Sequence, residues 1–221
     1  TPGVYYRYTG TAVITFQQSF RNQKFIQDNT AAILIDDNSG AITTTYNLYD
    51  GISNIVGTVA EYGGMMQFTP LADPGPAVST GNVIIPQEIS LNELVTNFEE
   101  YESELVRVMG VSFDTADNVL TFTNGTLYPM NNGLMNFRTT FYDVDYIGMP
   151  VPTGLWNIIG IPNSRVAEGN LFTARCWADF SSAGIVLPSP VVNISVQNNI
   201  ITLSWEPVTG ATSYRIEAAD D

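Results

Sequence analysis

A heptapeptide that occurs twice sets the strongest limit on the fold of this chain. The motif GISNIVG at residues 51–57 returns at residues 154–160 as GLWNIIG, with Gly, Asn, Ile and Gly at the same spacing. Two more landmarks keep this register. Gly10 and Gly110 each open an apolar run before the motif, and QFT or LFT follows it at residues 67–69 and 171–173. Such self-similarity indicates two tandem copies of one β-rich unit.

Short apolar, β-branched runs bounded by turn residues predict strands throughout both copies. The runs cover residues 8–16, 24–27, 31–35, 51–62 and 65–70 in the first copy, and 102–113, 118–123, 134–142, 154–161 and 170–180 in the second. Gly63-Gly64 suits a tight hairpin turn with positive φ. One helix is expected over residues 90–102, where Ser90 and Glu93 form a capping box. A five-stranded unit of this kind predicts a small closed barrel.

The composition changes near the end of the chain. LPSP at residues 187–190 reads as a linker, and residues 191–196, 200–205 and 213–218 alternate apolar and polar side chains. We therefore expect an all-β chain with three parts: barrel 1 over residues 1–88, barrel 2 over residues 89–185, and a partial sandwich over residues 186–221.

Charge and missing residue types exclude several functions. The net charge is −14, with only 8 basic residues in 221, which opposes binding to nucleic acid or to anionic membranes. Histidine is absent, so the commonest general base and metal ligand is lacking. The single cysteine, Cys176, is expected to be a buried small apolar residue. The chain is expected to be no enzyme, to need no cofactor or transition metal, and to insert in no membrane, because it holds no run of eighteen apolar residues.

Residues 4–184 resemble a known kind of domain. The runs at residues 8–16, 25–28 and 32–37, with residues 102–111 opening the second copy, resemble the OB-fold-like tandem repeats of secreted multidomain proteins from the Bacteroidota. The resemblance implies two OB-like barrels with a short helix between them and an extracellular or bacterial cell-surface location. It assigns no catalytic residue.

Residues 188–221 resemble the start of a fibronectin type III domain. Residues 201–208 and 210–216 match its second and third strands, with Trp205 and Tyr214 as the implied core aromatics. Three strands of a seven-stranded sandwich leave apolar side chains short of partner surface. We expect completion by adjoining domains of the same polypeptide or by neighbouring copies in a head-to-tail filament, with these assembly residues: Val192, Ile201, Leu203, Trp205 and Ile216.

Three groups of residues are candidate sites. Aromatic platforms without basic residues favour carbohydrate over nucleic acid, and the platform candidates are Trp156, Tyr46, Tyr49 and Tyr62. Oxygen-rich turns make weak calcium candidates, although neither is an EF-hand loop: Asp36 and Asp37 in one, Asp143 and Asp145 in the other. Asp-Thr-Ala at residues 114–116 fits the O-glycosylation pattern that the first resemblance implies, at Thr115.

These observations favour a non-catalytic structural or adhesive module of a bacterial surface protein. A carbohydrate-binding accessory module of a secreted enzyme is the first alternative, and Trp156→Ala would then abolish glycan binding. An accessory domain of a secreted nuclease is the second. It predicts salt-sensitive DNA binding, which the acidic charge opposes.

Overall fold

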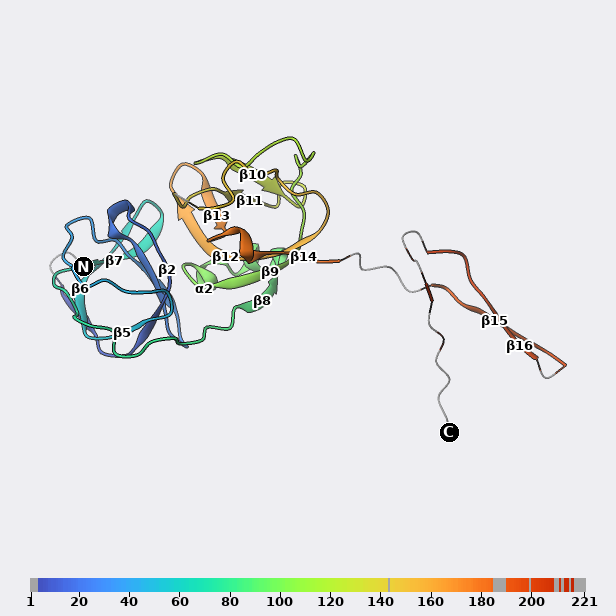
Figure 1. The fold of residues 1–221 in the computed structure, drawn as a ribbon, viewed down its shortest axis with the longest axis horizontal. Coiled ribbons are helices and arrows are strands. Elements are labelled where there is room, and N and C mark those ends of the chain that lie inside the picture. Colours follow the sequence, from blue (N-terminus) through green and yellow to red (C-terminus); the bar gives the residue numbers. More distant parts are fainter. Residues whose placement is uncertain are drawn as a thin grey trace. The chain divides into compact units, whose positions relative to one another are not determined.

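The computed structural model describes residues 4–142, 144–184, 190–198 and 200–208, together with Ala211, Ser213, Tyr214 and Ile216. The chain is mostly β-sheet with a few short helices. Contacts between residues divide it into two units, Thr1–Ser182 and Ala183–Asp221. The first unit contains both predicted copies, so they share one compact body (Figure 1).

The first copy, called repeat 1, follows the sequence expectation in three of its five runs, whereas the runs expected over residues 8–16 and 51–62 are each broken into two strands. Its strands pair in the order β1-β6-β7-β4-β3-β2-β5, with β4 parallel to β7 and the other pairs antiparallel. Tight turns at Gly63 and Gly64, both with positive φ, join β6 to β7. The elements are β1 Tyr6–Tyr8, β2 Ala12–Gln17, the 3-10 turn η1 Phe20–Asn22, β3 Lys24–Gln27, β4 Ala32–Ile35, β5 Gly51–Ile52, β6 Ile55–Tyr62 and β7 Met65–Pro70.

The second copy, called repeat 2, has the same succession of pairs. Its order is β10-β11-β13-β12-β9, with β11 parallel to β13, and a bridge between Phe113 and Met130 links the segment after β9 to β10. The edge strand β8 runs parallel to β9, and β14 pairs with β12. The elements are β8 Gln87–Ser90, β9 Val106–Val111, β10 Leu127–Met130, β11 Met135–Arg138, β12 Trp156–Arg165, β13 Gly169–Thr173, the 3-10 turn η2 Trp177–Asp179 and β14 Phe180–Ser182.

The two heptapeptides occupy corresponding strands. Two residues after the last glycine of each heptapeptide, the chain pairs with the phenylalanine of the QFT or LFT sequence. Val59 pairs with Phe68 in repeat 1, and Pro162 pairs with Phe172 in repeat 2. Both glycines lie under that phenylalanine ring. A Cβ on Gly160 would lie 2.6 Å from a ring carbon of Phe172, and one on Gly57 would meet the Phe68 ring and a backbone oxygen. The repeated glycine is therefore a packing requirement of the shared unit.

The repeated asparagine is used differently in the two copies. Asn54 has a positive φ of 55° and separates β5 from β6. Asn157 lies inside β12, and its Oδ1 accepts a hydrogen bond from the backbone N–H of Gly110 at 3.0 Å. Both asparagines lie where strand pairing is irregular. Asn54 lies in the break between β5 and β6, and at Asn157 the pairing of β12 with β9 shifts register between Trp156 and Ile158. The motif therefore marks an irregular point in the strand pairing of both repeats. The positive φ of Asn54 accommodates it in repeat 1, and the hydrogen bond from Gly110 to Asn157 accommodates it in repeat 2.

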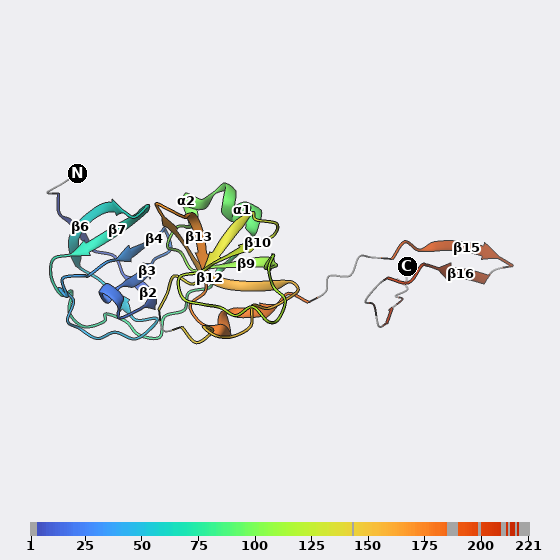
Figure 2. The same ribbon diagram turned by 90° about the horizontal axis from the view of Figure 1, so that it is seen from above.

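The helix expected over residues 90–102 is broken in two. α1 spans Leu91–Thr96 and α2 spans Phe98–Tyr101, with Asn97 outside helical geometry between them (Figure 2). Half of the capping box forms, since Ser90 Oγ accepts from the Glu93 N–H at 3.1 Å. The Glu93 carboxylate instead accepts from the Tyr101 hydroxyl at 2.9 Å, which ties α2 back onto α1.

Two strand predictions in repeat 2 are wrong in detail. Residues 118–123 form a loop with one bridge, Thr121 to Pro150, because Asp117 turns the chain by accepting the N–H groups of Val119 and Leu120. Residues 170–180 do not form one strand. β13 ends at Thr173, and the η2 turn separates it from β14.

Buried side chains join the repeats. One apolar cluster lies within repeat 1 around Ile14, Ile35 and Phe68. The other fills repeat 2 and also includes Phe16, Phe25, Leu34 and Met65 of repeat 1. Phe16 stacks on Phe141 with ring centroids 4.1 Å apart. The core of the second repeat therefore extends across the boundary between the copies.

The second unit contains the antiparallel hairpin of β15 Asn193–Gln197 and β16 Ile200–Ser204. Trp205 packs against Tyr214 with ring centroids 5.2 Å apart, and the Tyr214 hydroxyl accepts from the Val208 N–H. The predicted third strand at residues 213–218 falls partly outside the described residues, and those of its residues that are described do not form a strand. Of the expected assembly residues, Val192, Ile201 and Ile216 are exposed, whereas Leu203 and Trp205 are half-buried.

Candidate functional site

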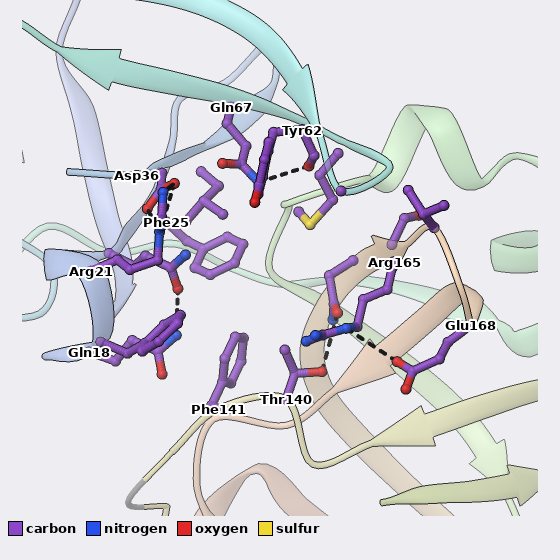
Figure 3. Close-up of a pocket in the computed structure, with 18 of the residues that line it drawn as sticks. Gln18, Arg21, Phe25, Asp36, Tyr62, Gln67, Thr140, Phe141, Arg165 and Glu168 are labelled. Carbon is purple, nitrogen blue, oxygen red and sulfur yellow. Dashed lines mark hydrogen bonds and ion pairs between the residues drawn. The ribbon is translucent and has the colours of Figure 1, made fainter. Parts of the chain in front are cut away.

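A cleft of about 670 Å³ opens between the two repeats. Repeat 1 contributes η1, β3, β4 and the β6–β7 hairpin, and repeat 2 contributes residues 140–142 and the β12–β13 turn (Figure 3). The two hairpin turns touch at one side of it, where the Val166 N–H donates to the Gly63 carbonyl at 2.9 Å. The cleft therefore exists only because the repeats are joined.

Aromatic rings form the base and the rim of the cleft. Phe25 meets Phe141 edge-on, with ring centroids 5.5 Å apart. Phe20 and Tyr142 form an exposed pair, 5.2 Å between centroids, with one ring from each repeat. The Tyr62 side chain is 67% exposed and faces the cleft from the end of β6 (Figure 3). Aromatic faces are thus open to a ligand at several points.

A fixed ion pair stands on the wall from repeat 1. Arg21 donates from Nε to Asp36 Oδ1 at 2.7 Å and from Nη2 to Asp36 Oδ2 at 2.5 Å. These hydrogen bonds raise the pKa of Arg21. The guanidinium carbon lies 5.9 Å from the centre of the Tyr62 ring. The positive φ of Arg21, 51°, arises in the η1 turn that presents this side chain.

A second charged group stands on the wall from repeat 2. Glu168 Oε2 lies 2.7 Å from Arg138 Nε and 3.3 Å from Arg165 Nε. Arg165 ends β12, Glu168 lies in the turn that follows, and Arg138 ends β11. One carboxylate is therefore shared by two guanidinium groups, of which Arg165 faces the cleft (Figure 3).

The four predicted aromatic candidates do not converge. Tyr62 lines the cleft, but Tyr46 is 3% exposed, and its hydroxyl donates to the Gly75 carbonyl. A ring so buried has no face for a ligand, so the proposal for Tyr46 is wrong. Tyr49 is half-buried and accepts from Arg175 Nη1 at 3.2 Å. Trp156 packs on Trp177 and donates to the Thr153 carbonyl, away from the cleft lining.

The structure adds cleft residues that the sequence reasoning missed: Phe20, Arg21, Tyr142, Arg165 and Glu168. One signal was present, because basic residues are rare in this chain and two of the eight lie here. Their convergence could not be read from the sequence, since Arg21 and Arg165 are 144 residues apart.

The calcium candidates already have protein partners. Arg21 holds both oxygens of Asp36, and the Asp37 carboxylate accepts from the N–H groups of Ala41 and Ile42 and from Asn22 Nδ2. Asp145 accepts from the Trp177 N–H at 2.6 Å. The Asp37 and Asp145 carboxylates accept backbone N–H groups, and the Asp36 carboxylate pairs with Arg21, so the protein itself engages all three. Calcium binding at these residues stays a prediction. Asp143 lies outside the described residues.

Thr115 is exposed in a turn that follows Phe113. Asp114 anchors the turn by accepting the N–H groups of Asn132 and Gly133. The hydroxyl of Thr115 is therefore accessible, and its glycosylation stays a prediction.

Comparison of the chain with models of protein families, with curated proteins and with solved structures finds no match in any of the three. Across the described residues, no three His, Cys, Asp or Glu side chains are grouped so that they could hold a metal ion. None of the helices in the described part of the chain is long and apolar enough to cross a membrane.

Proposed function

We propose that this chain is a non-catalytic adhesive module of a secreted bacterial surface protein, and that the cleft between its repeats is the binding surface. The observation that carries the proposal is a cleft with exposed aromatic rings and fixed planar polar groups on facing walls. Recognition sites commonly combine these two features. Both repeats share one succession of strand pairs, in which β4 runs parallel to β7 and β11 runs parallel to β13. This shared order supports the resemblance to OB-like barrels.

The charged groups of the cleft support binding without turnover. Hydrolysis of a glycosidic bond needs two carboxyl groups free to act on the substrate. Both oxygens of Asp36 are held by Arg21, and Glu168 is shared by Arg138 and Arg165. The chain also contains no histidine to act as a general base. We therefore expect ligands to be retained unchanged.

The test measures retention and turnover on the same material. The full chain is immobilised and offered a panel of soluble polysaccharides, and bound polysaccharide and newly formed reducing ends are both quantified. We expect retention that falls in Tyr62→Ala and persists in Tyr5→Ala, a control whose side chain is similarly exposed at 65% but lies outside the cleft lining. Release of reducing ends would contradict the non-catalytic role, and failure to retain any polysaccharide would contradict the adhesive one.

A second candidate function, self-association, is favoured by the β15–β16 hairpin. Its cross-strand partners place Ile194 opposite Leu203 and Val196 opposite Ile201, so these four side chains share one face. Within the described residues of the second unit, Ile194, Val196 and Ile201 are exposed. Neighbouring copies that cover this face would bury it by pairing like surfaces.

Sedimentation of the full chain over a range of concentrations tests this second candidate. We expect association that Val196→Lys removes, because the lysine falls on the apolar face. Ser195→Lys is the matched control, since Ser195 pairs with Thr202 on the opposite face. A wild-type chain that stays monomeric at every concentration would contradict self-association. Adjoining domains of the same polypeptide would then be the expected partners of the apolar face of the hairpin.

A further inference from the structure

The cleft differs in charge from the rest of the protein. Its charged lining residues are Arg21, Asp36, Arg165 and Glu168, so two cationic groups face two carboxylates. The buried Arg138 lies outside the lining and pairs with Glu168. The chain as a whole carries −14. The lining of the cleft is therefore balanced in charge, in contrast to the acidic chain as a whole.

The guanidinium group of Arg165 is available to a ligand. Its Nε lies 3.3 Å from Glu168, which is already bound more closely by Arg138 at 2.7 Å. In the described part of the chain, no hydrogen bond or ion pair engages its two terminal nitrogens, and its side chain is 47% exposed. A guanidinium group with a free edge suits bidentate pairing with a carboxylate.

Flat apolar surface lies within the same cleft. Tyr62 belongs to the facing wall, and the Phe20–Tyr142 pair lies at the rim. A pyranose ring presents a face of C–H groups to an aromatic ring and directs its hydroxyls sideways. Arg21, which Asp36 holds in place next to Tyr62, is partly exposed and offers its guanidinium edge as a fixed donor for such hydroxyls.

We infer that the cleft binds an oligosaccharide that contains a uronic acid. The sugar ring stacks on Tyr62, and its carboxylate pairs with the free edge of Arg165. This inference rests on the proposed adhesive role, whose ligand class it names. The net charge of −14 disfavours a nucleic acid such as DNA, because one available guanidinium does not offset the repulsion between the acidic chain and a row of phosphates.

Calorimetric titration of the full chain with two matched ligands tests the inference. The probes are tetragalacturonic acid and its fully methyl-esterified form, in which each carboxylate is replaced by an uncharged methyl ester. We expect the acid to bind at least about tenfold more tightly than the ester, as a single well-placed charge pair provides. Raising the salt concentration should reduce the difference in affinity between the acid and the ester.

Four variants assign the effect to residues. Arg165→Gln should lose about tenfold in affinity for the acid and bind acid and ester alike. Tyr62→Ala should weaken both ligands by about tenfold, because stacking does not depend on charge. Arg107→Gln and Tyr5→Ala are the controls, since both residues are exposed outside the cleft lining, and both should bind as wild type. Circular dichroism confirms that each variant is folded.

Three results would overturn the inference: equal binding of acid and ester by wild type, unchanged discrimination in Arg165→Gln, or binding of neither ligand. In each case the retention assay on other polysaccharides decides the adhesive role separately. A chain that retains a neutral polysaccharide through Tyr62 but ignores the uronic acid would keep the proposed function and lose this ligand class.

Discussion

At the scale of single residues, the hydrogen bond between Tyr8 and Asp28 makes the stability of repeat 1 depend on pH. The Tyr8 hydroxyl donates to Asp28 Oδ2 at 2.6 Å. Burial, together with this bond to Asp28, raises the pKa of Tyr8 to about 12. Burial disfavours the Asp28 carboxylate, but hydrogen bonds from Thr30 and Tyr8 outweigh it and hold the pKa of Asp28 at about 2.

The signs of the two shifts define a pH window. The depressed pKa of Asp28 stabilises the fold above pH 3.8, and this contribution is lost as pH falls toward 2. The raised pKa of Tyr8 stabilises the fold below pH 10.0, and this contribution is lost as pH rises toward 12. Tyr8→Phe should therefore lower the free energy of unfolding by about 1 kcal/mol near neutral pH, reduced by solvent screening.

Urea unfolding of wild type and Tyr8→Phe across the pH range checks this prediction. The difference between them should shrink toward both extremes. Tyr6→Phe is the control, because Tyr6 is exposed on the same strand. A difference that does not vary with pH would show that the hydroxyl acts through packing alone.

Substitution of alanine for the last glycine of either heptapeptide should lower the stability of the chain by a similar amount. Gly57→Ala and Gly160→Ala each place a methyl group against a phenylalanine ring and a backbone oxygen. Overpacking of this kind costs about 1–3 kcal/mol, and the two values should agree because the positions correspond. Gly133→Asn, in a turn with open space around it and a positive φ that asparagine tolerates, should be near neutral. Thermal unfolding measures all three, and a silent variant at either heptapeptide glycine would contradict the correspondence.

At the scale of elements, local sequence patterns predict most of repeat 1. β3 and β7 match their expected runs because each is bounded by turn residues, and the Gly63-Gly64 hairpin forms where a positive φ is required. Repeat 2 was harder to predict. Asp117 diverts a β-rich run into a loop, and the break at Asn97 depends on a hydrogen bond from Tyr101 to Glu93, which periodicity does not reveal.

The cap of α1 gives a prediction at this scale. Ser90→Ala removes the acceptor for the Glu93 N–H and should lower the free energy of unfolding by about 1 kcal/mol. Thr96→Ala is the control on the same helix, since its hydroxyl bonds only to the Asn92 carbonyl one turn earlier and alanine favours the helix. Chemical denaturation compares the two. Equal effects would show that the Ser90 cap has no special role.

The candidate site was only partly predictable for a related reason. Tyr62 stands at the end of a recognisable strand, so its exposure could be anticipated. Arg21 and Arg165 carry no local mark, and their role depends on which hairpins meet across the boundary between repeats. Tyr46 illustrates the opposite error, because an aromatic residue in a polar loop becomes core when that loop folds over the sheet.

At the scale of the whole molecule, Arg175 joins the two repeats. It pairs with Asp179 through Nε at 3.0 Å and Nη2 at 2.8 Å. Its Nη1 reaches into repeat 1, to the Thr15 carbonyl at 2.9 Å and the Tyr49 hydroxyl. Burial opposes its charge, but the hydrogen bonds and charge of Asp179 outweigh that effect and raise the pKa of Arg175. Together with the shared aromatic core, the hydrogen bonds of Arg175 join the two repeats into one compact body.

Arg175→Gln should weaken this joint. The substitution leaves Asp179 buried without its guanidinium partner, which costs about 3–5 kcal/mol in comparable sites. Since the cleft depends on the joint, uronic acid binding should fall although Arg175 does not line the cleft. Titration of Arg175→Gln with tetragalacturonic acid checks this, and unchanged affinity would mean that the cleft does not depend on Arg175.

Hydrogen exchange with mass spectrometry, on the full chain in increasing urea, tests directly whether the two repeats form one cooperative body. Peptides from β6–β7 report repeat 1, and peptides from β12–β13 report repeat 2. Because the core and Arg175 couple the repeats, both sets should lose protection at the same urea concentration. Separate midpoints in the wild-type chain would contradict the account, since the repeats would then unfold as independent domains with no fixed cleft between them.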